Sequence, residues 1–127
     1  MTEHDALVEA AQQARENAHA PFSNFRVGAA LHATSGRTFG GCNVENATYG
    51  LTVCAERVAI FKAMSEGERN FDAIAVVTDT DTLTPPCGAC RQVIYEFGPD
   101  AVVFFPGARG PKQAHITELL PEGFRLQ

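Results

Sequence analysis

The sequence predicts an α/β protein built in three layers, α/β/α, around a mixed central sheet. Two observations carry this prediction. Helical patterns alternate along the chain with short apolar runs, and the runs at 73–77 and 101–105 are continuously apolar, as expected for strands covered on both faces. A length of 127 residues, 45% apolar and 20% charged, favours a single domain over residues 1–127 and excludes a disordered or fibrous chain.

The N-terminal third predicts one helix followed by a hairpin. Residues 3–19 have an amphipathic pattern with a stripe of small residues, and Pro21 limits the helix. The stretches 25–33 and 37–43 are typical of strands, joined by a turn at 34–36 (Thr-Ser-Gly). The stripe consists of Leu7, Ala11, Ala14 and Ala18.

The remaining elements alternate between helix and buried strand. A helix is expected from Cys54 to Glu66, with Gly67 as its stop, before the strand at 73–77. After the loop 79–84 and two prolines, a second helix is expected from Cys87 to Phe97, stopped by Gly98-Pro99. The strand at 101–105 and a helical turn at 116–120 complete the order. In the first of these helices the residues expected to face inward are Val58, Phe61 and Ala63 or Met64.

Charge and hydropathy indicate a small-molecule protein of the cytoplasm. The formal net charge of −5 disfavours binding to the phosphate backbone of nucleic acids. The first twenty residues carry acids where a signal peptide needs bases, and nowhere do eighteen apolar residues run together, so no membrane partner is expected. In such a compartment thiols stay reduced, and cysteines are available for metal or redox chemistry.

Three of the four cysteines lie where helices are expected to begin. Cys54 starts one helix, and Cys87 and Cys90 lie in the first turn of the next, three residues apart and therefore on one face. Free amide groups and the helix dipole favour thiolate at such positions. Three thiolates leave the fourth position of a tetrahedral zinc open for water, as in a catalytic site. Cys42 lies in a strand pattern and is expected to pack in the core, with ligation as a minor alternative.

Charged residues beside these cysteines fit the same site. Glu56 follows Cys54 by two positions and can reach the metal-bound water if Cys54 is the first residue of the helix; a water on zinc has a pKa of about 7, and a carboxylate can carry its protons. Three thiolates leave a net negative charge on the metal. Arg57 could donate to one of them, and Arg91, beside Cys90, is a weaker candidate.

Two other classes of protein share part of this pattern. A lone Cys-x-x-Cys that opens a helix is also typical of thioredoxin-type dithiol proteins, but that chemistry has no use for a third helix-start cysteine or for Glu56. A non-catalytic zinc module would use Cys42 as a fourth ligand. The first predicts a reducible Cys87–Cys90 disulfide without zinc, and the second a zinc that depends on Cys42.

The combined motifs resemble a known family. Cys54-Ala55-Glu56 together with Pro86-Cys87-Gly88-Ala89-Cys90 matches the signature of zinc-dependent deaminases. The wider segments PFSNFRVGAAL (21–31), GCNVENATYGLTVCAERVAIFKA (41–63) and PCGACRQVIYEFG (86–98) are similar to the small homotetrameric cytidine deaminases. The resemblance extends from about Pro21 to Phe124.

The resemblance implies a fold, a reaction and a set of residues. It implies a sheet of about five strands, one Zn²⁺ per subunit, and hydrolytic deamination of cytidine and 2′-deoxycytidine in pyrimidine salvage, by a homotetramer with shared active sites. Cys54, Cys87 and Cys90 match the zinc ligands, and Glu56 the proton-shuttling glutamate. Matches to substrate-binding positions are Phe25 in the pocket wall, Asn43 and Glu45 on the ribose hydroxyls, Ala55, Tyr49 in a loop that reaches a neighbour's site, and Phe124, which stacks on the base from a neighbouring subunit.

Two relatives within the superfamily are alternatives. A blasticidin-type deaminase shares Cys-Ala-Glu and Pro-Cys-Gly-x-Cys-Arg-Gln, but the Asn-Val-Glu-Asn segment at 43–46 and the Pro-Phe-Ser-x-Phe segment at 21–25 favour the nucleoside enzyme. A deoxycytidylate deaminase would need basic groups placed for the phosphate and would more typically offer His-Ala-Glu in place of Cys-Ala-Glu, and neither feature is evident.

Overall fold

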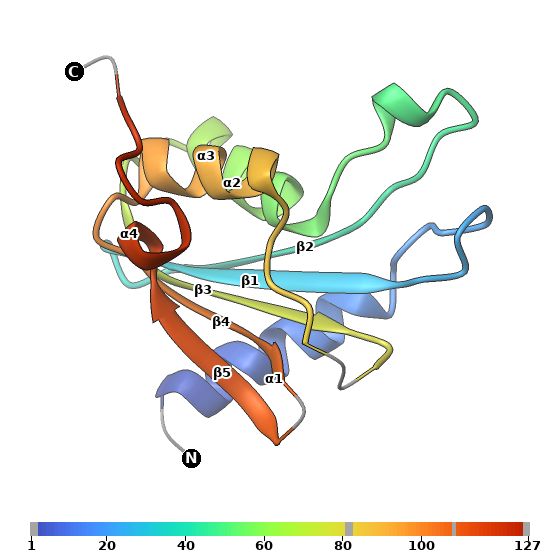
Figure 1. Ribbon diagram of the computed structural model, residues 1–127, viewed down its shortest axis with the longest axis horizontal. Helices are drawn as coiled ribbons and strands as arrows, with labels where there is room; N and C mark the ends of the chain where they lie inside the picture. Colours follow the sequence, from blue (N-terminus) through green and yellow to red (C-terminus); the bar gives the residue numbers. More distant parts are fainter. Residues whose placement is uncertain (1–2, 81–82, 108, 126–127) are drawn as a thin grey trace.

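A mixed five-stranded sheet in the order β2-β1-β3-β4-β5 forms the middle of the molecule (Figure 1). The computed structural model describes residues 3–80, 83–107 and 109–125. Only the β3–β4 pair is parallel among the pairs described, and the others are antiparallel. The strands are β1 (Val27–Ala33), β2 (Thr38–Cys42), β3 (Phe71–Thr78), β4 (Val102–Gly107) and β5 (Gly110–His115).

Helices cover both faces of this sheet. Helix α1 (Glu3–Arg15) lies on one face, and α2 (Ala55–Ser65) and α3 (Gly88–Phe97) lie on the other, with the short α4 (Ile116–Leu119) beside α3 (Figure 1). Successive residues of β1 enter different cores: Ala29 and Leu31 pack in the cluster under α2 and α3, and Ala30 packs under α1. The predicted three-layer α/β/α arrangement with about five strands is therefore confirmed. Among the described helices, none combines the length and the apolar character that crossing a bilayer requires.

Glycines let two helices approach the sheet closely. A Cβ on Gly41 of β2 would lie 2.5 Å from the backbone nitrogen of Ala59 and 2.7 Å from the carbonyl oxygen of Ala55. A Cβ on Gly28 of β1 would overlap the carbonyl oxygen of Ala11 in α1. The backbone of α2 is thus in direct contact with β2, which fixes the position of the first turn of α2.

The sequence misplaces the end of the first helix. We expected residues 3–19, but α1 ends at Arg15. Tighter backbone bonds follow, from the amides of Glu16 and Asn17 to carbonyls three residues back. His19 then pairs as a strand would: its amide donates to the carbonyl of Asn43 at 3.0 Å, and its carbonyl accepts from the amide of Glu45 at 2.8 Å. This pairing across the chain overrides the helical pattern.

The inward face of α2 is also displaced from the expected one. Phe61, expected inside, is 47% exposed, so that part of the prediction is wrong. Ala63 is buried and Met64 packs against the core from its edge. The face that meets the sheet consists of Ala55, Glu56, Ala59, Ile60 and Ala63. The close approach at Gly41 requires small residues at Ala55 and Ala59, where Phe61 would not fit.

The other predicted elements have the boundaries of the structure to within about two residues, and β5 is the one strand for which no boundary was predicted. The turn at 34–36 is present, with Gly36 at φ +99°, a conformation that glycine adopts without strain. Helix α3 ends at Phe97 as predicted. Strand β1 begins at Val27 rather than Phe25. No pattern in the sequence predicted the position of β5, a polar edge strand.

Candidate metal centre and active site

Two helices begin at cysteines that face each other. Cys54 is the N-cap of α2 and Cys87 the N-cap of α3, both with extended backbones, at φ −72°, ψ 152° and φ −68°, ψ 169°. Cys90 lies in the first turn of α3. Neither N-cap side chain accepts a capping hydrogen bond from its helix. The sulfurs of Cys54, Cys87 and Cys90 all lie within 4.8 Å of one another.

This cluster fits one metal ion. Sulfurs that bind a tetrahedral zinc at about 2.3 Å are roughly 3.8 Å apart, so only a small adjustment of the side chains is needed. Thiolates are ligands that zinc prefers, and the three residues leave one tetrahedral position for a further ligand. In the part of the chain that the structure describes, this is the one such group of histidine, cysteine and acidic residues.

Arg57 stabilises the thiolate form of Cys54. Its Nη2 donates to the Cys54 sulfur at 3.2 Å, as the sequence predicted. The pKa of Cys54 falls to about 5, first because the Cys90 thiol donates to it and then because of the hydrogen bond and charge of Arg57, against desolvation. The pKa of Cys90 is raised, since its proton is the one shared with the Cys54 thiolate. The site therefore holds negative charge at neutral pH before any metal binds.

Glu56 is buried beside these sulfurs, in the first turn of α2. Its side chain is 5% exposed. Burial raises the pKa of Glu56 to about 6, and the negative charge of Cys54 adds to the effect. A carboxyl group with a pKa near the working pH is suited to accept and return protons.

A pocket of about 230 Å³ opens onto Cys54, Cys87 and Glu56. Its walls come from the ends of β1 and β3, the loop before α2 and the loop before α3. The other lining residues are Val27, Asn43, Thr52, Ala55, Val76, Thr78, Thr84 and Pro85. Apolar walls with a few polar groups around a reactive centre are typical of small-molecule sites.

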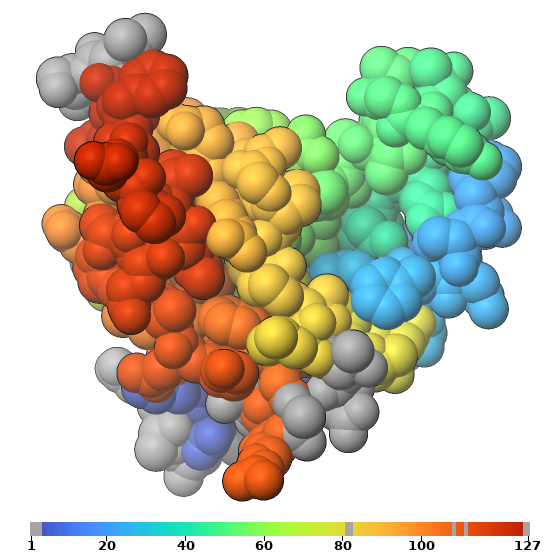
Figure 2. Space-filling view, in the orientation of Figure 1, coloured from blue at the N-terminus to red at the C-terminus, as the bar shows by residue number. Residues whose placement is uncertain are grey.

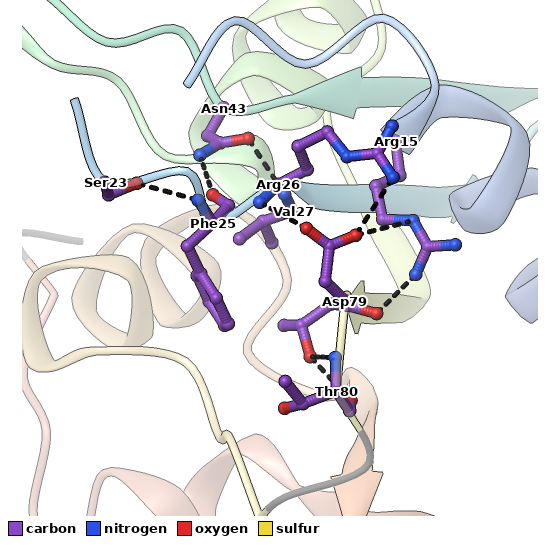
Figure 3. A network of polar contacts seen from close by, with 9 residues as sticks. Arg15, Ser23, Phe25, Arg26, Val27, Asn43, Asp79 and Thr80 are labelled. Atoms are coloured by element: carbon purple, nitrogen blue, oxygen red, sulfur yellow. Dashed lines mark hydrogen bonds and ion pairs between the residues drawn. The ribbon is translucent and has the colours of Figure 1, made fainter. Parts of the chain in front are cut away.

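Asn43 holds the segment that leads into β1 (Figure 3). Its side-chain Nδ2 donates to the carbonyl oxygen of Phe25, and its side-chain Oδ1 accepts from the backbone amide of Val27, both at 2.9 Å. Asp79 holds the same segment from the other side, since it accepts from the amide of Arg26 at 3.0 Å and lies 3.3 Å from the Arg26 guanidinium. The ring of Phe25 points away from Asn43 (Figure 3), so Phe25 meets Asn43 through its backbone.

Glu45 lies in a second hollow next to the metal pocket. This hollow, of about 320 Å³, is lined by Glu45, Phe22, Ser23, Tyr49 and Thr52. Thr52 lines both hollows, so the two are adjacent. The structure thus brings Asn43, Ala55 and Glu56 into the metal pocket and places Glu45 beside it.

Tyr49 and Phe124 are largely exposed. Tyr49 lies on the 3₁₀ turn η1 (Tyr49–Leu51), is 75% exposed, and belongs to a loop that projects beside the segment at 20–25 (Figure 2). Phe124 is 69% exposed, and its carbonyl oxygen accepts from the side chain of Gln92 at 3.2 Å. Phe124 and Phe25 are not among the residues that line the metal pocket.

Two expectations about neighbouring residues are corrected. Arg91 does not bond a thiolate: its guanidinium donates to the carbonyl oxygens of Pro86 at 2.7 Å and Leu119 at 2.9 Å. Cys42 is half-buried rather than in the core, at the end of β2, where it lines a surface hollow with Lys62. Cys42 lies outside the three-cysteine cluster.

Thr52 and Ser23 are site residues that the sequence reasoning missed. Thr52 precedes Cys54 by two positions and Ser23 lies in the Pro-Phe-Ser-x-Phe segment, so their places in the motifs were visible. Ser23 contacts Glu45, 22 residues later, and the Thr52 hydroxyl accepts from the amide of Asn46, six residues earlier. Both contacts depend on how the loops fold, and no local pattern in the sequence indicates them.

Comparison with known proteins agrees with the site. The family model described as the cytidine and deoxycytidylate deaminase zinc-binding region matches residues 1–106. A cytidine deaminase of Halalkalibacterium halodurans is 51% identical over 123 residues, which cover 95% of this chain and 93% of that protein. The solved structure of a cytidine deaminase from Burkholderia pseudomallei has a TM-score of 0.90 and 52% identity, covering 98% of this chain and 100% of the other.

The blasticidin-type relative is more distant. Blasticidin-S deaminase of Bacillus cereus is 33% identical over 103 residues, covering 75% of this chain. The metal-centre geometry, the family match and the similarity over nearly the whole chain agree. The chain belongs to the cytidine deaminase family of zinc-binding hydrolytic deaminases.

Proposed function

We propose that this protein converts free cytidine and 2′-deoxycytidine to uridine and 2′-deoxyuridine, with water consumed and ammonia released, as a step of pyrimidine salvage in the cytoplasm. The observation that carries the proposal is the buried carboxyl group of Glu56 beside three clustered cysteine sulfurs at the base of a pocket. A group that can gain and lose a proton is thereby held next to a metal site that a small molecule can reach.

Glu56 performs the proton transfers in this mechanism. A zinc ion held by Cys54, Cys87 and Cys90 supplies Lewis acidity, which makes water a better nucleophile at neutral pH. Glu56 takes a proton from the attacking water and delivers it to N3 of the base. After the C4–O bond has formed, Glu56 takes the second proton from the new C4 hydroxyl and passes it to the amino group; the C4–N bond breaks, the C4 carbonyl forms and ammonia leaves. Its pKa of about 6 suits both directions of transfer.

The remaining residues bind and orient the nucleoside. Asn43 and Glu45 bind the ribose hydroxyls, which suits an amide and a carboxylate in adjacent hollows. Ala55 contacts the base in the metal pocket, and Phe25 forms part of the wall once substrate is bound. Arg57 moderates the negative charge of the ligands. Arg91 braces the loop at Pro86 against Leu119, which holds Cys87 in place.

We also propose that the working enzyme is a homotetramer of single-domain chains with shared sites. Tyr49 and Phe124 are exposed aromatic side chains outside the metal pocket, and in a tetramer each would complete the site of a neighbouring subunit. The net charge of −5 supports a free nucleoside as substrate, with neither nucleic acid nor membrane as a partner.

The deciding experiment measures zinc content and the change in absorbance as cytidine becomes uridine, for the wild type and for Glu56→Gln. We expect about one zinc per chain in both proteins and a loss of roughly 10²–10⁴-fold or more in kcat for the variant. A dithiol redox protein would show no bound zinc. Near-normal turnover by Glu56→Gln would overturn the mechanism.

A further inference from the structure

The carboxylate of Glu45 is held by the segment that precedes β1. One of its oxygens, Oε1, accepts from the amide of Phe22 at 2.9 Å and from the amide of Ser23 at 3.1 Å. The other, Oε2, accepts from the hydroxyl of Ser23. These donors lie 22 and 23 residues before Glu45 in the chain, so the segment that precedes β1 and the segment that follows β2 are joined at this point.

The direction of the Ser23 hydrogen bond is fixed by its neighbours. The Ser23 oxygen accepts from the amide of Phe25 at 3.0 Å, and an amide can only donate. The carboxylate of Glu45 can only accept, so the single hydroxyl proton of Ser23 goes to Glu45. Consistent with this, the pKa of Glu45 is lowered, and the Ser23 hydroxyl is the largest cause.

These contacts leave Glu45 with a restricted choice of ligand. An ionised carboxylate has about four acceptor positions, and the chain fills three of them. The remaining position can take one hydrogen bond from a group that donates. Because this hollow shares Thr52 with the metal pocket, a nucleoside with its base at the metal centre extends its sugar towards Glu45.

We propose that Ser23 is a positioning residue that fixes the Glu45 carboxylate and thereby makes the site select nucleosides whose sugar carries a donating hydroxyl group on C2′ or C3′. The inference rests on the proposed function, in which Glu45 binds the ribose. Ser23 touches no reacting atom; it acts through Glu45. Its loss weakens the binding of sugars with a 2′- or 3′-hydroxyl and leaves unchanged both the chemical step and the binding of sugars that lack these two hydroxyls.

The test compares cytidine with 2′,3′-dideoxycytidine in wild type and Ser23→Ala. For cytidine we expect KM to rise about tenfold with kcat within about twofold, since one hydrogen bond to a charged group loses its partner. The inhibition constant of 2′,3′-dideoxycytidine against cytidine deamination should stay within about twofold. Ser23→Thr keeps the hydroxyl and should restore the KM for cytidine.

Ser35 provides a matched control. Its hydroxyl donates to the carboxylate of Glu68 at 2.9 Å and accepts from the amide two residues later, as Ser23 does, but in the turn at the other end of β1. Ser35→Ala should leave the cytidine KM and the dideoxycytidine inhibition constant unchanged. Thermal unfolding of both variants separates a change in binding from a change in folding.

A double variant tests whether Ser23 acts through Glu45. If it does, Ser23→Ala adds little to the KM of Glu45→Gln, because the two changes remove one interaction. Additive effects, equal losses for both nucleosides, or an unchanged KM in Ser23→Ala would each overturn the inference. A wild type that does not deaminate cytidine at all would instead overturn the proposed function.

Discussion

The three clustered thiols differ in exposure, and this makes one of them the best probe of the metal centre. Cys87 is exposed, Cys54 half-buried and Cys90 buried. Cys87→Ser should therefore remove a ligand with little loss of packing. We expect zinc content to fall from about one per chain to a small fraction, with activity falling in parallel.

Cys42→Ser is the control for that substitution. Cys42 lies outside the cluster, so this variant should keep both zinc and activity. Metal analysis of the purified variants measures the zinc content of each, and circular dichroism checks that both are folded. Zinc that depends on Cys42 as strongly as on Cys87 would point to a four-cysteine structural site.

Arg57 should set the pH at which the metal is lost. Its guanidinium lowers the pKa of Cys54, so in Arg57→Gln that pKa rises and protons compete with the metal at higher pH. On acidification we expect Arg57→Gln to release zinc at a higher pH than the wild type, measured with a chromogenic chelator.

Lys62→Gln is the control for this effect. Lys62 lies on the same helix and carries the same charge, but it donates to the carbonyl oxygen of Gly40 and not to a cysteine. Lys62→Gln should therefore release zinc at the same pH as the wild type. Equal shifts in the two variants would assign the effect to net charge rather than to the contact with Cys54.

Residues in contact along one helix turn could be predicted from the sequence, and residues positioned by other segments could not. Cys54 and Arg57 are three apart, so their contact follows from helical geometry alone. Arg91 was expected near a thiolate for the same kind of reason, but the carbonyl of Leu119, 28 residues later, takes its guanidinium. Nothing local to Arg91 indicated that contact.

At the scale of elements, the contact between α2 and β2 positions the start of α2, which carries Cys54 and Glu56. Gly41 has no room for a side chain, because a Cβ would lie 2.5 Å from backbone of α2. We expect Gly41→Ala to destabilise the zinc-loaded protein by about 1–3 kcal/mol, the usual cost of overpacking, and to lower activity by displacing Cys54 and Glu56.

Gly50→Ala is the control for this effect, since no atom lies within 4 Å of a Cβ there. Thermal unfolding should show a drop of several degrees for Gly41→Ala and little change for Gly50→Ala. Equal unfolding temperatures for the two variants would contradict this prediction, because α2 would then accommodate the added methyl group without loss of stability.

Elements with a strong apolar pattern were predictable, and polar ones were not. The buried run at 73–77 identified β3 because both of its faces are covered. Strand β5 (Gly110–His115) has no such pattern, since it lies at the sheet edge and pairs only with β4 among the described strands. The position of β5 is set by its pairing with β4, and a pattern within residues 110–115 alone cannot indicate that pairing.

At the scale of the whole molecule, the exposed Phe124 offers a test of shared active sites. Phe124→Ala should lower activity if the ring completes a neighbour's site. Co-expression of Phe124→Ala subunits with Glu56→Gln subunits should then restore activity well above the average of the two pure variants. In mixed oligomers some sites combine an intact Glu56 from one subunit with an intact Phe124 from the next.

Sedimentation should give a mass near four times that of the 13.6 kDa chain for the wild type. A fully active monomer, or mixed oligomers with only average activity, would contradict sharing. Residue type and pattern alone would place Phe124 in the core, where aromatic residues are more often found, and only the family resemblance indicated a contact with a neighbouring subunit.

The unequal exposure of the three thiols also affects how the metal-free protein loses its ability to bind zinc during oxidation. Cys87 is the most accessible of the three to an oxidant in solution, and Cys90 is the least accessible. Once Cys87 has become a sulfinic or sulfonic acid, it no longer offers a thiolate, and added zinc cannot rebuild the site. The apoprotein therefore passes from reversibly to irreversibly inactive through damage at a single position. Chelators and air together are more harmful in purification than either is alone.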